Sequence, residues 1–366
     1  MLAPSNPPLH MTPIILLGAG KIGETIAQFL HGSGDYTLTV ADQDPARLTA
    51  IAALGVKTAR ADFGEARALA TLIGGNAMAI SACPFRLTPA IAQASVSAGA
   101  HYFDLTEDVE STRRVKAMAA GAGTALVPQC GLAPGFISIL ARAMTRKFES
   151  LRDVQMRVGA LPVYPTNALK YNLTWSTDGL INEYCNPCEA IIDGSIRETL
   201  ALEEIEAFSL DGIAYEAFNT SGGLGTLCET LSGSVENLNY KTVRYPGHRD
   251  LVKMLIRDLR LGQRRELLKD VLEASVPMTH QDVVLVFVTV SGMLDGRLTQ
   301  ESFAKKIYSN TLGTRPYSAI QITTAAGVCA MVDLMREGAL PQRGFVRQED
   351  ADLERFLANR FGQHYA

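Results

Sequence analysis

The sequence predicts an α/β protein with two domains: a Rossmann-type domain built on a parallel sheet, and a second α+β domain with a mixed sheet. The first third of the 366 residues alternates short apolar segments with helical ones, a glycine-rich turn joins the first pair, and the alternation ends after Arg142. Repeated strand–helix units form parallel sheets that helices cover. We expect residues 1–145 and 315–366 to form the Rossmann domain, and 146–314 the substrate domain.

The expected elements of the first domain follow one another directly. PIILL is an apolar strand, GAGKIG is a turn, and the segment from Glu24 has helical apolar spacing. YTLTVAD is a β-branched strand that ends in an acid, and the next helix opens near Pro45 and closes at Gly55. The pattern continues through the segments VKTARAD, ALATLIGG, AMAISAC, TPAIAQASVSAG and HYFDLTE.

The glycine-rich turn indicates a dinucleotide site because a strand precedes it, a helix follows it, and Asp42 ends the next strand. Gly18 permits a tight turn, Gly20 permits close approach of a pyrophosphate, and Gly23 permits helix–strand packing. Asp42 would accept hydrogen bonds from ribose hydroxyls and repel a 2′-phosphate, so we expect NAD as the cofactor. Arg47 leaves NADP open, as does Arg60, and an incidental glycine turn is the structural alternative.

Further cofactor contacts are expected beyond the turn, since the switch-point rule places the end of the fourth strand near the nicotinamide. Cys83 lies there; a small residue packed on the cofactor is favoured over a nucleophile, because no histidine is near it in sequence. The full expected cofactor set is Gly18, Gly20, Lys21, Ile22, Gly23, Asp42, Asp62, Ala82 and Cys83.

The second domain is expected from short strands with hairpin turns at Asp193-Gly194 and Asp211-Gly212, and from a long apolar strand at 283–294. Two amphipathic helices are expected between Leu251 and Ala274. The C-terminal segment returns to helices, which we expect to pack on the first domain.

Composition favours a small-molecule partner. Lys+Arg (34) nearly balances Asp+Glu (38), with a net charge of −4, so no nucleic acid or membrane partner is expected. The proline-rich residues 1–11 lack the features of a secretory signal, and we expect a poorly ordered leader on a cytoplasmic homo-oligomer, a dimer. Cys185 and Cys188 form a CxxC pair without further ligands at suitable spacing, so no metal site is expected.

Two polar segments of the second domain carry candidate chemistry. YNLTWSTDGLINEY contains Tyr171 and the only tryptophan, Trp175, and NYKTVRYPGHRD contains Arg244 and His248. A guanidinium suits a carboxylate, and a histidine exchanges protons near neutral pH. A surface turn beside a basic strand end is the structural alternative.

The chain resembles the saccharopine dehydrogenase family from Pro13 onward. GAGKIG with Asp42, HYFDLTED, QCGLAPGF, KYNLTWSTDGLINEY, SGGLGTL and YKTVRYPGH match in order, and within the family the chain is most similar to the lysine 6-dehydrogenases. The resemblance implies hydride transfer to NAD from a carbon that bears nitrogen, followed by hydrolysis of the imine. The implied substrate is L-lysine at its ε-carbon. A saccharopine-type or carboxynorspermidine-type reaction on a secondary amine is the alternative. Two alternatives lie outside this class of enzyme: a lipid carbonyl or enoyl reductase, and a non-catalytic NAD sensor.

The resemblance also implies site residues. Arg244 would bind the α-carboxylate, and Ala133 and Trp175 would contact the substrate. Ala133 occupies the position of an aspartate in saccharopine-handling relatives, which favours the lysine branch. Glu107 is the expected acid. Asp104 competes for this role, and capping of the local backbone is its structural alternative. The expected proton carriers are His248 first, and then Lys170 and Tyr171.

Overall fold

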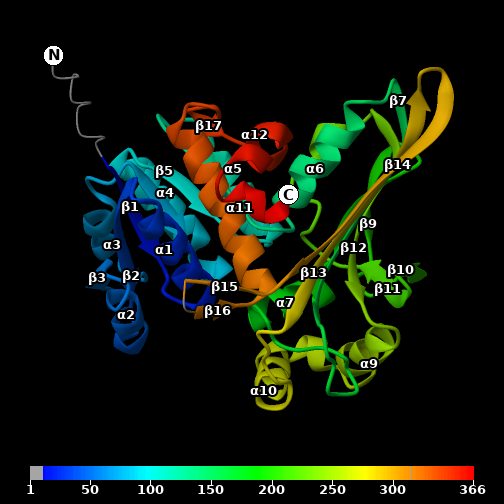
Figure 1. The fold of residues 1–366 in the computed structure, drawn as a ribbon, viewed down its shortest axis with the longest axis horizontal. Coiled ribbons are helices and arrows are strands. Elements are labelled where there is room, and N and C mark those ends of the chain that lie inside the picture. The colour runs from blue at the N-terminus through cyan, green and yellow to red at the C-terminus, as the bar shows by residue number, and fades with distance from the viewer. Residues whose placement is uncertain (1–10, 314) are drawn as a thin grey trace.

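The computed structural model describes residues 11–313 and 315–366, so the first ten residues of the expected leader lie outside the described part. Two sheets lie at opposite ends of the molecule, with helices between and around them (Figure 1). The first is a seven-stranded sheet in the order β17-β6-β5-β4-β1-β2-β3, with every pairing parallel. The predicted Rossmann-type sheet is therefore confirmed.

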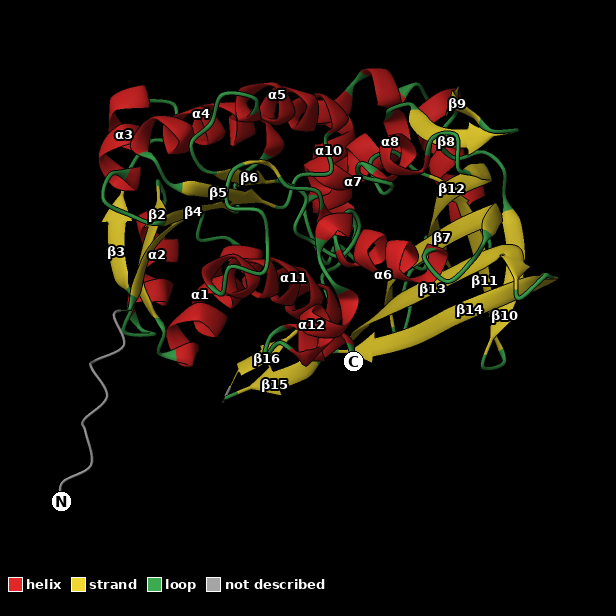
Figure 2. Ribbon diagram, turned by 90° about the horizontal axis from the view of Figure 1, so that it is seen from above, coloured by secondary structure: helices red, strands yellow, loops and turns green. Residues whose placement is uncertain are grey.

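Apolar β-branched strands and short amphipathic helices form this first domain. Its strands are β1 (Thr12–Leu17), β2 (Tyr36–Asp42), β3 (Lys57–Arg60), β4 (Met78–Ser81), β5 (His101–Asp104), β6 (Ala125–Val127) and β17 (Gly344–Phe345). Its helices are α1 (Lys21–Ser33), α2 (Pro45–Ala52), α3 (Ala66–Ile73), α4 (Thr88–Ala98), α5 (Val109–Ala119), α6 (Phe136–Thr145), α11 (Ala319–Arg336) and α12 (Leu353–Ala358). Figure 2 shows α3, α4 and α5 along one face of the sheet and α1 and α11 along the other.

The second sheet is mixed, as predicted, in the order β10-β11-β12-β7-β13-β14; β8 pairs with β12 and with β9. β12 runs parallel to β7, and the other pairings are antiparallel. The strands are β7 (Ser150–Pro162), β8 (Cys188–Ile192), β9 (Ser195–Thr199), β10 (Glu206–Leu210), β11 (Ile213–Asn219), β12 (Val235–Arg244), β13 (Asp282–Leu294) and β14 (Arg297–Tyr308). The helices are α7 (Thr177–Cys185), α8 (Leu227–Leu231), α9 (His248–Lys253) and α10 (Arg265–Ser275). A two-stranded ribbon, β15 (Asn310–Leu312) with β16 (Arg315–Tyr317), precedes α11.

Helix boundaries differ slightly from expectation. α1 begins at Lys21, because the chain turns into the helix directly after Gly20. The first of the two helices expected after Leu251 begins earlier, at His248, and runs into a π-helical turn at Met254–Asp258. These shifts place the start of each helix against the turn that precedes it.

The C-terminal segment packs on the first sheet. β17 extends the sheet by pairing with β6, and Asp333 on α11 accepts hydrogen bonds from the Tyr36 hydroxyl and from the Arg360 guanidinium. Asp333 and Tyr36 are buried and Arg360 is half-buried, so these hydrogen bonds tie the C-terminal segment to β2. None of the helices described combines the length and the apolar character needed to cross a bilayer.

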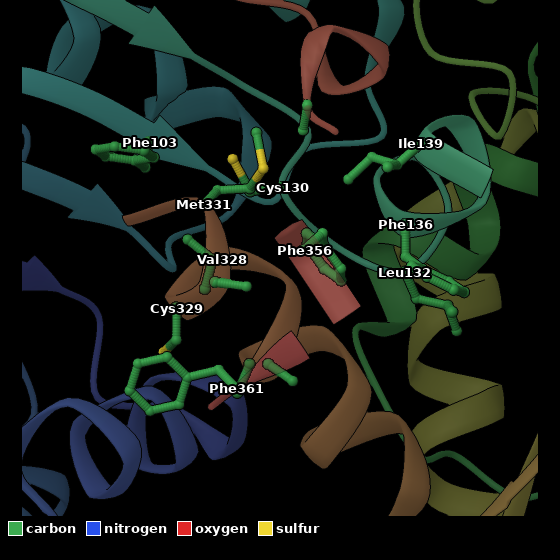
Figure 3. Packing of buried hydrophobic residues seen from close by; sticks show 14 of the residues in the cluster. Phe103, Cys130, Leu132, Phe136, Ile139, Val328, Cys329, Met331, Phe356 and Phe361 are labelled. Carbon is green, nitrogen blue, oxygen red and sulfur yellow. The ribbon is translucent and has the colours of Figure 1, made fainter. Parts of the chain in front are cut away.

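The loop PQCGLAPGF, which follows β6, is packed between tail helices and α6. Figure 3 shows Cys130, Leu132 and Phe136 beside side chains of α11 and α12. The Phe136 ring lies 5.7 Å from that of Phe356, and the Gln348 amide donates to a backbone carbonyl of the loop at 2.7 Å. This packing holds the loop at the edge of the sheet where the strands end.

Candidate active site

An interdomain cavity of about 180 Å³ lies where the two domains meet. Segments that follow β4, β5 and β6 form its first-domain wall, together with residues of α1 and α11. β7, α7 and β12 form its second-domain wall. Ligands of parallel α/β sheets bind beyond the carboxyl ends of the strands, so the cavity has the expected position for a substrate next to a dinucleotide.

The glycine-rich turn fits a dinucleotide pyrophosphate. Gly18 has φ +104°, and a Cβ there would lie 2.6 Å from the carbonyl oxygen of Ala82. A Cβ on Gly23 would overlap the Gly18 carbonyl, so the helix could not pack here with any larger residue. A Cβ added to Gly20 would have one described atom outside its chain neighbours within 4 Å, Arg47 Nη1 at 3.9 Å. The start of α1 is capped by no side chain, which leaves its N–H groups available to an anion.

Asp42 lies at the end of β2, beside the turn. Its Oδ2 accepts the Ala19 backbone N–H at 2.7 Å, and its Oδ1 accepts that of Asp44 at 2.9 Å. The exposed Arg47 guanidinium lies 3.9 Å from Oδ2. The carboxylate is thus fixed next to the position where an adenosine ribose would meet the turn.

Three of the expected cofactor residues, Ile22, Ala82 and Cys83, line the cavity. The Cys83 thiol donates to the Leu17 carbonyl at 3.2 Å, and burial raises its pKa to about 12. A thiol in this state is a poor nucleophile, so the geometry favours a small wall residue, as expected.

Lys21 and Asp62 are not part of the cavity wall. Lys21 Nζ lies 2.9 Å from the sulfur of Met278, and burial lowers its pKa. Asp62 is exposed and accepts the backbone N–H of Gly64 at 2.9 Å, which closes the turn after β3.

Arg244, at the end of β12, is 3% exposed and faces the cavity. Its Nε donates to the Tyr184 hydroxyl at 3.0 Å and its Nη1 to the Val243 carbonyl at 2.9 Å. Burial lowers its pKa, but Tyr184, Tyr171 and Glu183 together raise it by more, so the group stays charged. Among the described residues, the hydrogen-bond partners of the guanidinium are Tyr184 and a backbone carbonyl, while Glu183 acts on it through its charge alone. A buried cation that has no hydrogen bond to a carboxylate and borders a cavity is suited to an anionic ligand.

The expected proton carriers lie behind the wall. His248 is 1% exposed, with Nδ1 2.7 Å from the Leu169 carbonyl and Nε2 3.0 Å from the Tyr184 hydroxyl. Burial and the Arg244 charge lower its pKa to about 3. Lys170 is exposed, and its ammonium donates to the Pro246 carbonyl at 2.8 Å. The geometry therefore favours neither as a group that meets the substrate.

Tyr171 and Trp175 support the wall differently. The Tyr171 ring lies 4.9 Å from the Arg244 guanidinium, and its hydroxyl accepts the Trp175 indole N–H at 3.1 Å. Trp175 itself lines the cavity, whereas Tyr171 is buried behind it. The tyrosine thus orients both the arginine and the tryptophan.

Glu107 follows β5 and lines the cavity, as expected for an acid at the end of a parallel strand. Burial, with the nearby negative charges, raises its pKa to about 7. Glycines allow its close packing: a Cβ on Gly179 would lie 2.9 Å from Glu107 Oε1, and one on Gly222 would lie 3.2 Å from Glu107 Cβ. Two motifs of the second domain, WSTDG and SGGLG, therefore close against this loop.

Asp104 has a local role, as anticipated for the competing acid. Its carboxylate accepts the backbone N–H groups of Thr106 and Gln129, both at 2.9 Å, and the Tyr102 hydroxyl at 2.9 Å. Burial raises its pKa to about 6. The side chain joins the end of β5 to the loop after β6.

Ala133 lines the cavity, next to Pro134 in the loop after β6. The methyl group contributes apolar surface at the point where its saccharopine-handling relatives are expected to carry a carboxylate. The structure describes no group of three or more His, Cys, Asp or Glu side chains placed to hold a metal ion.

Glu183 was not identified by sequence reasoning. It lies on α7, lines the cavity and is 7% exposed; burial raises its pKa to about 8, and the Glu107 charge adds to the rise while Arg244 opposes it. Helical spacing contains a signal, since Gly179 and Glu183 are four residues apart and share one helix face. Tyr240 and Thr242 of β12 complete this side of the wall.

A parallel dinucleotide-binding sheet, a second mixed sheet and a charged cavity between them define a two-domain NAD(P)-binding protein. The chain belongs to the saccharopine dehydrogenase family, whose members are oxidoreductases. Residues 14–127 match the model of the saccharopine dehydrogenase NADP binding domain, and residues 131–363 match that of the saccharopine dehydrogenase C-terminal domain.

Individual relatives agree with this assignment. The chain is 19% identical over 314 residues to the mitochondrial alpha-aminoadipic semialdehyde synthase of Bos taurus, covering 81% of this chain and 33% of that protein. It is 20% identical over 191 residues to the Rattus norvegicus protein of the same name, covering 50% and 21%. The chain thus spans a third or less of these relatives.

A solved structure shares the fold. Saccharopine dehydrogenase (L-Glu forming) from Saccharomyces cerevisiae, in its apo form, matches with a TM-score of 0.78 and 18% identity, covering 95% of this chain and 97% of the other.

Proposed function

We propose that the protein catalyses NAD-dependent oxidative deamination of an amino acid with a side-chain amine, namely L-lysine at its ε-carbon. The charge distribution in the cavity supports this proposal. Among the described residues that line it, the one cation is Arg244 and the carboxylates are Glu107 and Glu183. These charges match a substrate that places one carboxylate and one ammonium group inside the cavity. Any further charged group of the substrate would point to solvent.

The reaction requires a neutral amine before hydride leaves. The overall conversion is RCH₂NH₃⁺ + NAD⁺ + H₂O → RCHO + NADH + NH₄⁺ + H⁺. A dinucleotide held by the GAGKIG turn and Asp42 would supply the hydride acceptor. In this proposal, Arg244 holds the α-carboxylate, and the Glu107 carboxylate takes the proton from the ammonium group. Carboxylates near the reacting carbon stabilise the iminium charge that develops there.

The position and hydrogen bonds of Asp42 favour NAD over NADP. Its fixed carboxylate suits a ribose that carries free hydroxyls, whereas a 2′-phosphate would bring a second negative charge to the same place. Two guanidinium groups lie near it: Arg47 is exposed and within 3.4 Å of Asp44, and Arg60, which pairs with Asp42 across β2 and β3, donates its Nε to the Gln43 carbonyl at 3.3 Å.

The alternatives match the cavity less well. Saccharopine carries several carboxylates and would need cations beyond Arg244. A carboxynorspermidine-type compound carries one carboxylate and differs from lysine in its secondary amine and greater length. A lipid carbonyl or enoyl reductase would need an apolar cavity, and a non-catalytic NAD sensor needs no buried acids in the substrate position. A volume of about 180 Å³ also suits a small ligand.

The test is turnover of purified full-length protein with NAD and a panel of lysine, ornithine, diamines and saccharopine. We expect NADH absorbance and free ammonia with lysine, in equal amounts. Saccharopine-type cleavage of a secondary amine would produce NADH without ammonia, which separates the two reactions. Tight NAD binding without turnover of any amine would contradict the proposal and favour the sensor.

A further inference from the structure

Glu183 is a buried acid that accepts no side-chain hydrogen bond from the described residues, and the Arg244 charge only partly offsets the effect of burial on its pKa. The side chain is 7% exposed and borders the cavity. Desolvation and charge alone account for its raised pKa, with no hydrogen bond to the carboxylate from the described residues. A carboxylate in a protein interior that accepts no hydrogen bond is unfavourable. A cationic or protonated ligand in the cavity would therefore stabilise the charged form of Glu183.

Glu107 lies against the same face of α7. Gly179 is one helical turn before Glu183, and its missing side chain leaves room for Glu107, whose Oε1 would lie 2.9 Å from a Cβ there. The backbone on either side is fixed as well, because Ser221 N–H donates to the Glu183 carbonyl at 3.0 Å and Gly222 packs on Glu107. Two acids from different domains are thereby held on one side of the cavity.

We propose that Glu183 and Glu107 form a carboxylate pair that binds the ammonium group of the substrate, accepts its proton and selects primary amines. This inference rests on the proposed function and deepens it by assigning Glu183, with Arg244 at the opposite charge end of the substrate. A primary ammonium group has several N–H donors and can reach both carboxylates, whereas a secondary amine carries a carbon substituent in place of one donor.

The proton transfer balances within the pair. One N–H bond of RCH₂NH₃⁺ breaks, and its proton forms an O–H bond with the ionised member of the pair, leaving RCH₂NH₂. The C–H bond then breaks and its electrons leave with the hydride, while the nitrogen lone pair forms the C=N bond of RCH=NH₂⁺. The acid formed on the pair returns its proton to solvent or to the departing ammonia.

Other charged groups face the pair and set its titration. The groups that act on Glu183, or on which it acts, are Arg244, Glu107, Tyr171, Tyr184, Tyr240 and Cys188. The groups that act on Glu107 are Asp104, Asp108 and Asp178. The Glu107 charge raises the pKa of Glu183, and in this proposal the two acids titrate as a coupled pair.

The first test compares binding of lysine with that of norleucine, which lacks the terminal amine, to the full-length protein with NADH. Wild type should bind lysine at least tenfold more tightly. Glu183→Gln should lose that preference, and Glu189→Gln should keep it, because Glu189 is an exposed acid that pairs with Arg113 at 2.9 Å outside the cavity. A lysine preference that survives Glu183→Gln overturns the inference.

The second test follows the Glu183 carboxyl by ¹³C NMR, with its signal assigned from Glu183→Gln. Glu107→Gln should lower the midpoint of that titration, because a negative neighbour is removed. An unchanged midpoint would show that the acids are not coupled, and would also overturn the pair. Thermal unfolding of each variant verifies that it is folded.

Turnover separates this inference from the proposed function. With lysine as substrate, Glu183→Gln should reduce kcat by about 100-fold or more, and Glu189→Gln should not change it. If wild type oxidises lysine and Glu183→Gln does so equally well, the pair fails while the function stands. If wild type oxidises no amine, the function fails, and the binding comparison still decides whether the pair recognises an ammonium group.

Discussion

The Nε of Arg244 donates a hydrogen bond of 3.0 Å to the hydroxyl of Tyr184. This bond and the one from Nη1 to a backbone carbonyl fix the guanidinium plane, and the Tyr171 ring lies 4.9 Å from its centre. Arg244 lines the interdomain cavity, and its Nη2 makes no hydrogen bond to the described residues. A planar donor pair held in this way is organised for one carboxylate before any substrate arrives.

Arg244→Lys should raise the KM for lysine by about 10- to 100-fold, because an ammonium group cannot reproduce the two parallel N–H donors. The kcat at saturation should fall less, since the reacting carbon lies at the other end of the substrate. Steady-state kinetics measure both constants. An unchanged KM would place the α-carboxylate elsewhere.

His248→Phe should raise KM several-fold and leave the pH dependence of kcat unchanged. The pKa of His248 is lowered to about 3, so the ring is neutral at working pH and cannot cause a limb near neutrality. Its contact with the Tyr184 hydroxyl supports Arg244 indirectly. In wild type, the depressed pKa means that stability is lost as pH falls from about 6.5 toward 3, when the unfolded chain gains the proton first.

A pH–rate profile and acid unfolding measure these two effects of His248→Phe. The variant should lack the histidine's share of the acid-induced loss of stability. Disappearance of a limb near pH 7 would instead identify His248 as the proton carrier.

Gly179→Ala should reduce kcat/KM by about tenfold or more without stabilising the protein. Alanine is favoured in helices by about 1 kcal/mol, but a Cβ here would lie 2.9 Å from Glu107 Oε1 and overlap the Trp175 ring, and overpacking of this kind costs about 1–3 kcal/mol. Gly32→Ala on α1 is the matched control, because no atom lies within 4 Å of its Cβ. Thermal unfolding and kinetics distinguish the two, and equal activity of both variants would contradict the proposed packing.

Asp42→Ala should weaken NAD binding by about tenfold or more, and NADP binding much less. Hydrogen bonds to a carboxylate contribute about 1.5–3 kcal/mol, and the variant also loses the repulsion of a 2′-phosphate. Calorimetric titration with each cofactor measures the effect, with Asp44→Ala as the control for an exposed neighbouring acid. A wild-type preference for NADP would refute the assignment.

Much of the fold could be predicted from local pattern. The GAGKIG turn with Asp42 located the dinucleotide site, since glycine positions and the end of a strand are local properties of the chain. Arg244, Glu107, Ala133 and Trp175 were also found, and all four line the interdomain cavity. Arg244 ends a strand, Glu107 and Ala133 follow strands, and Trp175 precedes a helix, and the types of these elements were readable from their periods.

The burial of His248 and Glu183 could not be predicted in this way. His248 has the right intrinsic pKa, but burial beside Arg244 removes its charge and its contact with the cavity. Glu183 is an ordinary acid in sequence, and only its burial on α7 raises its pKa to about 8. Burial and neighbouring charge depend on segments distant in the chain, so no local pattern reports them.

By itself, the sequence determined a parallel dinucleotide-binding domain, a mixed second sheet and the family to which the chain belongs, because these depend on periodicity, turn residues and motif order. Only the tertiary structure decided which polar groups meet. It brought Glu107 and Glu183 from separate domains to one helix face and placed Arg244 on the same cavity. The physical reason is that electrostatic free energy depends on distance and on exclusion of water, and both are set by packing across the two domains.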